Sequence, residues 1–216
     1  MIVAIIDYGS GNLHSVAKAF ELQSLKMETT NVLVTNKPDE VALADRIVLP
    51  GVGSYSHCFN GLASIDGLID SLEYVVVRRG QPFLGICVGM QLMSTFGLEH
   101  GKNFGLDWIP GTVRPIDTQE ASLKIPHMGW NNLKWHCSHP VFENLGSDPD
   151  VYFVHSFYFE PDSESNLIAT VDYGGTVTAA VGKDNLVGTQ FHPEKSQANG
   201  LKILDNFAKW DGSSSV

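Results

Sequence analysis

Cys87 has the surroundings of a catalytic nucleophile. It follows the apolar run 83–86, and glycines at Gly85 and Gly89 stand two residues to either side. A nucleophile elbow has this Gly-x-nucleophile-x-Gly pattern, because small flanking residues let a strand turn sharply into a helix. We predict a helix over 88–93 whose amino terminus favours the thiolate. The alternative for this motif alone is a buried structural cysteine.

A general base for this thiol is available in the segment His192-Pro193-Glu194. Proline favours an extended conformation in the preceding residue, and residues i and i+2 of an extended segment point to the same side. We therefore expect Glu194 to bind one nitrogen of His192 while the other nitrogen faces Cys87. Such a carboxylate fixes the tautomer and stabilises the imidazolium. The alternative is a surface turn before a helix capped by Ser196.

Backbone donors for a developing oxyanion could come from Pro50-Gly51-Val52-Gly53, which follows a predicted strand over 46–49. Two glycines around one residue can turn N–H groups toward a common point, where preorganised donors stabilise negative charge. An ordinary glycine-rich turn is the alternative.

The elements that must position these residues alternate along the first hundred positions. Apolar runs predict strands over 2–6, 32–35, 46–49 and 83–86, and helical spacing predicts helices over 13–25, 39–44, 54–62 and 65–79. Continuous apolar strands are typical of a parallel sheet covered on both faces. The fold class is therefore α/β, a doubly wound and mostly parallel central sheet with flanking helices and its site at the carboxyl ends of the strands.

The second half has a different character after about Gly97. Glycine, proline and tryptophan become frequent, and short strands are predicted over 111–116, 130–135, 151–159, 167–173, 177–181 and 186–190. A closing helix over 197–209 places Leu201, Leu204, Phe207 and Ala208 on one buried face. We expect one domain over residues 1–210 and a frayed tail over 211–216.

Composition limits the possible functions. The formal net charge of −10 over 216 residues argues against a nucleic-acid partner. Three scattered cysteines give neither a disulfide framework nor a zinc spacing, so we expect a reducing cytoplasm, no metal and no cofactor. The apolar start 1–6 is too short for a signal sequence or a membrane span. The turn 7–12 resembles a dinucleotide fingerprint, but His14 replaces its third glycine.

Taken together, these motifs identify the chain as similar to the class I glutamine amidotransferases. The elbow, the Pro-Gly-Val-Gly segment and His-Pro-Glu occur in that family's order. Four further blocks, at 7–12, 126–131, 152–156 and 192–197, resemble the glutaminase subunits of imidazole glycerol phosphate synthases. Val88 departs from the leucine that usually follows the nucleophile, but it keeps the backbone N–H.

The resemblance implies hydrolysis of L-glutamine to glutamate and ammonia. Cys87 would attack the amide, His192 would carry the proton to the leaving ammonia, and Glu194 would orient His192. The N–H of Val88 would join those of residues 51–53 in the oxyanion hole. The resemblance also implies that Gln91 and Glu99 hold the polar end of glutamine.

By the same resemblance, the backbone of His155, Ser156 and Phe157 lies along the substrate. Without the resemblance, Gln91 and Glu99 could equally be polar positions exposed to solvent. His155 would then be a strand histidine whose hydrogen bonds are all made within the fold.

The resemblance implies a (β/α)₈-barrel cyclase as partner in a heterodimer. Ammonia would react there with a phosphoribulosyl-formimino aminoimidazole carboxamide ribotide, giving imidazole glycerol phosphate for histidine synthesis and an aminoimidazole carboxamide ribotide. The family positions at the partner face match Asn12, Met128, Trp130, Tyr152 and Lys195. Exposed aromatic residues suit interface anchors, whereas the alternative for Trp130 and Tyr152 is a place in the core.

Three other functions remain open at this point. A paralogue could supply ammonia to a different synthase, for example in amidation of a surface sugar. A non-catalytic binding subunit of the same fold is disfavoured, because a site that has lost its activity has usually also lost one of its three reactive side chains. A cysteine peptidase on a similar sheet commonly has histidine directly after the nucleophile, where this chain has Val88.

Overall fold

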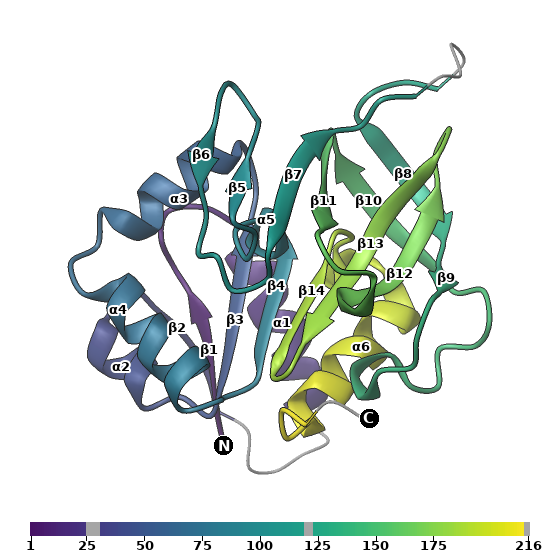
Figure 1. The fold of residues 1–216 in the computed structure, drawn as a ribbon. Helices are drawn as coiled ribbons and strands as arrows, with labels where there is room; N and C mark the ends of the chain where they lie inside the picture. Colours follow the sequence, from purple (N-terminus) through teal and green to yellow (C-terminus); the bar gives the residue numbers. More distant parts are fainter. Residues whose placement is uncertain (25–30, 119–122, 214–216) are drawn as a thin grey trace.

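The fold is centred on an eight-stranded sheet (Figure 1). It is seen in a computed structural model that describes residues 1–24, 31–118 and 123–213. The strand order is β2-β1-β3-β4-β14-β13-β12-β9. The first five of these strands pair in parallel and the last three antiparallel. In that order the strands are Asn31–Thr35, Ile2–Ile6, Arg46–Gly51, Phe83–Cys87, Leu186–Thr189, Thr176–Lys183, Leu167–Asp172 and Lys134–Trp135.

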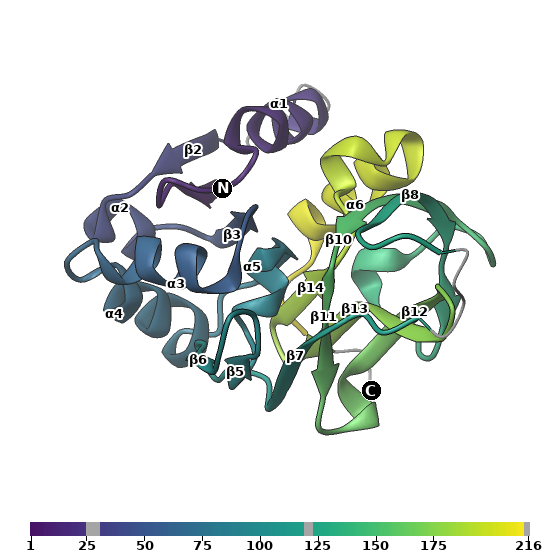
Figure 2. The ribbon, with the colours of Figure 1, turned by 90° about the horizontal axis from the view of Figure 1, so that it is seen from above.

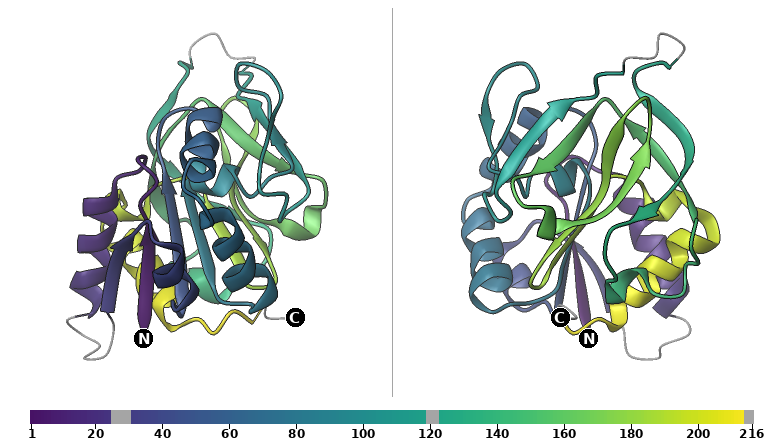
Figure 3. Two further views of the ribbon diagram at one scale, coloured as in Figure 1. Left: turned by 90° about the vertical axis from the view of Figure 1, so that its left-hand side faces the viewer. Right: turned by 45° about the vertical axis from the view of Figure 1, so that its right-hand side comes forward.

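Helices cover both faces of the parallel part. α1 (Leu13–Ser24) packs beside α6 (Gln197–Lys209) on one face, and α3 (Tyr55–Ala63) and α4 (Leu68–Leu72) lie on the other (Figures 2 and 3). The short α2 (Pro38–Ala42) packs on α4. Strand β4 is buried at every position, as expected for a strand between two helical layers. The predicted doubly wound α/β fold is confirmed.

The strand-rich half adds two smaller sheets beside the large one. One pairs β8 (His127–Asn132) with β10 (Asp150–His155), and the other has the order β11-β7-β5-β6. Those four strands are Phe157–Pro161, Gly111–Pro115, Phe96–Gly97 and Asn103–Phe104. The single strand predicted over 151–159 is wrong: the chain leaves one sheet at His155 and enters the other at Phe157, with Ser156 between them.

Several predicted boundaries also differ. The helix predicted over 65–79 begins later, at Leu68 after Gly67 (φ +73°), and continues beyond Leu72 as the π-helix η1 (Glu73–Arg78). The strand predicted over 130–135 is divided between β8 and β9. In α6, Ile203 is fully buried and Leu201 only partly, so the core face is turned slightly from the predicted one. The predicted end of α1 at residue 25 and the end of the tail lie outside the described residues.

None of the helices in the described ranges has the length and apolar character needed to cross a bilayer. Within the same ranges, no group of three or more His, Cys, Asp or Glu side chains is placed to hold a metal ion.

Candidate active site

Cys87 lies at a strained turn between β4 and α5 (Val88–Gln91), with φ 55° and ψ −112°. A non-glycine residue adopts such angles only where its surroundings hold it there. A Cβ on Gly89 would lie 1.8 Å from the carbonyl oxygen of Leu49, and one on Gly85 would lie 2.7 Å from that of Gly89. Both glycines are therefore required for the elbow. The helix predicted over 88–93 is shorter, since α5 ends at Gln91.

His192 is held between Glu194 and the backbone of β10. Its Nδ1 lies 2.8 Å from Glu194 Oε1, and the two side chains are only 2% and 1% exposed. Its backbone N–H donates to Tyr152 O, and its carbonyl accepts from Ser196 Oγ. The expected pairing is present and His192 is extended as predicted (φ −98°, ψ 100°), but the segment does not stay extended through Glu194. Pro193–Lys195 forms a 3₁₀ turn, and this turn brings the carboxylate back to the ring.

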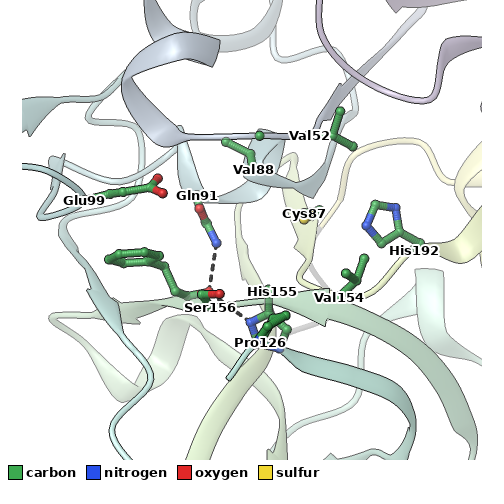
Figure 4. Close-up of a pocket in the computed structure, with 12 residues that line it drawn as sticks. Val52, Cys87, Val88, Gln91, Glu99, Pro126, Val154, His155, Ser156 and His192 are labelled. Carbon is green, nitrogen blue, oxygen red and sulfur yellow. Dashed lines mark hydrogen bonds between the residues drawn. The ribbon is translucent and has the colours of Figure 1, made fainter. Parts of the chain in front are cut away.

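The remaining ring nitrogen of His192 is available for chemistry. Nε2 has no hydrogen-bond partner among the described residues, and the ring lies beside Cys87 at the pocket (Figure 4). Burial lowers the pKa of His192, but the thiol of Cys87 and the carboxylate of Glu194 outweigh it and raise this pKa to about 9. An imidazole between two acidic groups can accept the thiol proton and hold it.

Cys87 and His192 open into a pocket of about 300 Å³. Its lining comes from the elbow, from the Val52-Gly53 segment and from the junction of β10 and β11 (Figure 4). The lining residues are Val52, Gly53, Cys87, Val88, Gln91, Glu99, Pro126, Val154, His155, Ser156, Phe157 and His192. All five predicted substrate-binding residues are among them.

Two polar side chains reach this pocket from the side away from His192 (Figure 4). Gln91 Nε2 donates to Phe157 O at 3.0 Å, which links α5 to β11. Glu99 accepts from the backbone N–H of Tyr55 at 2.7 Å, so this carboxylate is fixed at the amino terminus of α3. A carboxylate and a side-chain amide can together bind the ammonium group of an amino acid.

His155 is a satisfied histidine that also lines the pocket. Its Nδ1 bonds the carbonyl of Phe157 at 2.9 Å, and its Nε2 lies 3.0 Å from His127 Nδ1. Because a carbonyl only accepts, His155 carries its proton on Nδ1 and accepts from His127. Burial lowers the pKa of His155 to about 3 and that of His127 to about 4. The neutral pair thus fixes the bend at Ser156 rather than moving protons.

The predicted oxyanion donors are only partly in place. The turn 51–53 runs beside the elbow, where a Cβ on Gly51 would lie 2.8 Å from the backbone N of Gly89. The N–H of Val52, however, donates to Ser10 Oγ at 3.2 Å, and the Val52 carbonyl accepts from the same hydroxyl at 2.5 Å. The Gly51–Val52 peptide must turn before the Val52 N–H can donate to an oxyanion at Cys87.

Four of the five residues predicted to face a partner lie near one another, on β8, on β10 and in the turn 193–195. Met128 and Trp130 are 61% and 44% exposed on β8, opposite Val154 and Tyr152 of β10. The Trp130 and Tyr152 rings lie 6.0 Å apart, and Lys195 Nζ is 6.0 Å from the Tyr152 ring.

Asn12 immediately precedes α1, which contacts the turn 193–195. The alternative that Trp130 belongs to the core is excluded by its exposure, whereas Tyr152 is half-buried.

Among the residues that sequence reasoning did not assign to the site, Pro126 and Val154 line the pocket, and Ser10 and Gln190 form hydrogen bonds to site residues. Ser10 holds the Val52 peptide, and no sequence pattern near position 10 indicates that contact. Gln190 Nε2 donates to Cys87 Sγ at 3.6 Å. Gln190 stands two residues before His192, so the spacing rule applied to Glu194 would have found it.

The family model for "Glutamine amidotransferase class-I" matches residues 4–210. The chain belongs to this family. A protein of Rhodopseudomonas palustris named imidazole glycerol phosphate synthase subunit HisH is 55% identical, over 97% of this chain and 99% of its own length. Relatives of the same name from Rhodospirillum rubrum and Brucella suis are 50% and 51% identical, with the same coverage.

Solved structures support the fold. A structure described as a glutamine amidotransferase superposes with a TM-score of 0.70 at 16% identity, over 96% of this chain and 100% of that one. A glutamine amidotransferase from Thermotoga maritima gives a TM-score of 0.60 at 16% identity, over 97% of this chain and 83% of that one. At such identities the likeness concerns the fold alone.

Proposed function

We propose that this chain is the glutaminase subunit of an imidazole glycerol phosphate synthase. It hydrolyses L-glutamine to glutamate and ammonia and delivers the ammonia to a (β/α)₈-barrel cyclase in histidine biosynthesis. The observation that carries the proposal is the strained Cys87 beside a buried His192–Glu194 pair, with Cys87 and His192 both lining a pocket of about 300 Å³. The relatives named HisH at 50–55% identity support this synthase over a paralogue that serves another one. The proposed domain comprises residues 1–210.

In the proposed reaction, His192 Nε2 takes the proton from Cys87, and the sulfur attacks the carbonyl carbon of the glutamine side-chain amide. The carbonyl π electrons move to oxygen, where the backbone N–H groups of Val88 and of the turn 51–53 stabilise the charge. The tetrahedral intermediate then collapses, the C–N bond breaks, and His192 protonates the departing ammonia.

Water completes the reaction by attack on the γ-glutamyl thioester. His192 accepts a proton from this water and returns it to the sulfur as glutamate leaves. Glu194 stays ionised and keeps the proton-bearing Nδ1 directed at itself, so that Nε2 remains available throughout. All of these steps use side chains that are fixed by the elbow and by the turn 193–195.

The glutamine itself is held by its polar end. Gln91 and Glu99 bind the ammonium group, and the backbone of residues 155–157 lies along the side chain, which places the amide over Cys87. His192 is buried and Glu99 is half-buried, so the charges of both act on the substrate more strongly than they would in bulk water.

The cyclase covers the face formed by Asn12, Met128, Trp130, Tyr152 and Lys195. This face adjoins the pocket, since β10 carries both Tyr152 and the pocket residue Val154. Ammonia is mostly protonated in neutral water and is then not nucleophilic, so direct transfer to the partner preserves its reactivity.

The test compares wild type and Cys87→Ala, each assembled with the cyclase and its ribotide ligand. With glutamine as nitrogen donor, wild type forms imidazole glycerol phosphate and Cys87→Ala forms none. With ammonium salts at high pH, both form it at equal rates, because the cyclase is intact. Loss of both activities in the variant would assign Cys87 a structural role and contradict the proposal.

A further inference from the structure

Gln190 is a buried amide that touches both the nucleophile and a substrate-binding side chain. It follows β14 directly and has no exposed surface. Its Nε2 donates to Cys87 Sγ at 3.6 Å, and its Oε1 accepts from Gln91 Nε2 at 3.0 Å. None of the roles proposed above uses this residue.

The orientation of both amides follows from one backbone carbonyl. Gln91 contacts Phe157 O at 3.0 Å, and a carbonyl oxygen only accepts, so the Gln91 atom at this contact is nitrogen. The same nitrogen faces Gln190, whose contacting atom is therefore its oxygen. The other end of the Gln190 amide, an N–H₂ group, is then the one that faces the sulfur.

We propose that Gln190 stabilises the Cys87 thiolate and, through Gln91, fixes the acceptor that selects the ammonium group of glutamine. The proposal rests on the proposed glutaminase function. A hydrogen bond to an ionised acceptor is about twice as strong as one between neutral groups, so the contact favours thiolate over thiol. Unlike the protonated His192, an amide at this place cannot return a proton to the sulfur.

The contact with Gln91 sets which atom the substrate meets. Both protons of the Gln91 amide are used, one on Phe157 O and one on Gln190 Oε1. Its oxygen is left to the pocket and points away from those bonds, on the side of Glu99 (Figure 4). Two acceptors, Gln91 Oε1 and the Glu99 carboxylate, thus face the place where a cationic group binds.

The test uses two variants and one matched control. Gln190→Met keeps the volume but neither donates nor accepts, and Gln190→Asn keeps an amide that is one methylene too short for either contact. Thr189→Val is the control: Thr189 is also fully buried, and its hydroxyl donates to Phe191 O rather than to the sulfur. Urea unfolding establishes that each protein is folded.

The first readout is alkylation of Cys87 by iodoacetamide against pH on the full chain. Peptide mapping by mass spectrometry separates Cys87 from Cys58 and Cys137. We expect alkylation of Cys87 near neutral pH to be about tenfold slower in both Gln190 variants, because less of the sulfur is thiolate, and to be unchanged in Thr189→Val. The other ionisable groups around the sulfur are the same in all proteins: His192, Glu194, Tyr8 and Cys58.

The second readout is the glutaminase activity of each protein in complex with the cyclase. We expect kcat/KM to fall at least tenfold in both Gln190 variants, with a higher KM for glutamine because Gln91 loses an anchor. An unchanged alkylation rate of Cys87 together with an unchanged KM would mean that Gln190 only fills space in the core. Equal effects of Thr189→Val would lead to the same conclusion. Absence of ammonia release by the wild-type complex would instead refute the proposed function, while the alkylation result still decides the sulfur contact.

Discussion

The substitution Glu194→Gln tests how the buried carboxylate controls His192. It keeps the shape of the side chain and removes its charge. The carboxylate accepts from the proton on His192 Nδ1 at 2.8 Å. An amide can instead donate to Nδ1, which moves the ring proton to Nε2, where the thiol proton must be received. The variant thus loses both the charge and the productive tautomer.

The magnitude follows from the environment of the ring. Burial lowers the pKa of His192, but Cys87 and Glu194 raise it from 6.5 to about 9. At 1.36 kcal/mol per pKa unit, this shift corresponds to roughly 3 kcal/mol in favour of the charged ring. Removing one of the two acidic partners lowers the pKa by about one to three units. By analogy with the orienting aspartate of serine hydrolases, kcat falls by about 10⁴-fold.

The sign of the stability effect is determined by the raised pKa. The folded protein binds this proton more tightly than the unfolded chain, so the stabilisation is fully present below pH 6.5 and is lost as the pH rises through about 9. We expect urea unfolding to show Glu194→Gln less stable than wild type by about 1–4 kcal/mol at about pH 6. The difference shrinks as the pH rises beyond about 6.5 and is lost as it passes through about 9.

Glu160→Gln serves as the control, because Glu160 is half-exposed in a surface pair with Arg114. Such pairs contribute about 0–1 kcal/mol, with no link to the active site. A stability difference for Glu194→Gln that is the same at low and at high pH, or a kcat close to that of wild type, would refute the reasoning.

Three further predictions concern the elbow, the oxyanion turn and the partner face. Gly89→Ala pushes a Cβ to 1.8 Å from Leu49 O, so urea unfolding should show a loss of about 3 kcal/mol or more; a loss below about 1 kcal/mol would mean that the elbow adapts. Ser10→Ala frees the Val52 peptide, so ammonia release without the cyclase should rise about tenfold, since one or two hydrogen bonds are removed; an unchanged or lower rate contradicts the restraint. Trp130→Ala should weaken cyclase binding in calorimetry by about 2 kcal/mol, as an anchoring aromatic does, and an unchanged affinity would place the partner elsewhere.

The reactive residues could be predicted because the residues that define each motif stand close together in the sequence. Gly85 and Gly89 bracket Cys87 closely along the chain, and no bulkier residue fits there. His192 and Glu194 are near neighbours in the chain. Their pairing was therefore predicted correctly, although Glu194 lies in a 3₁₀ turn and not in an extended segment. The parallel strands were predicted because continuous apolar runs have few alternatives to burial between two layers.

What could not be predicted depends on contacts between distant segments. The bend at Ser156 is fixed by the His127–His155 pair, which joins two strands whose histidines are 28 positions apart. The N–H of Val52 donates a hydrogen bond to Ser10, which is 42 residues away in the chain. Neither contact leaves a local pattern in composition or spacing.

The most direct test of the proposed chemistry is the identity of the covalent intermediate. The wild-type complex with the cyclase is mixed with isotope-labelled glutamine, quenched in acid within one turnover, digested and analysed by mass spectrometry. Nucleophilic attack by Cys87 predicts the γ-glutamyl label on the peptide that contains this residue and nowhere else. A label on Cys58 or Cys137, or continued ammonia release by Cys87→Ala, would contradict it.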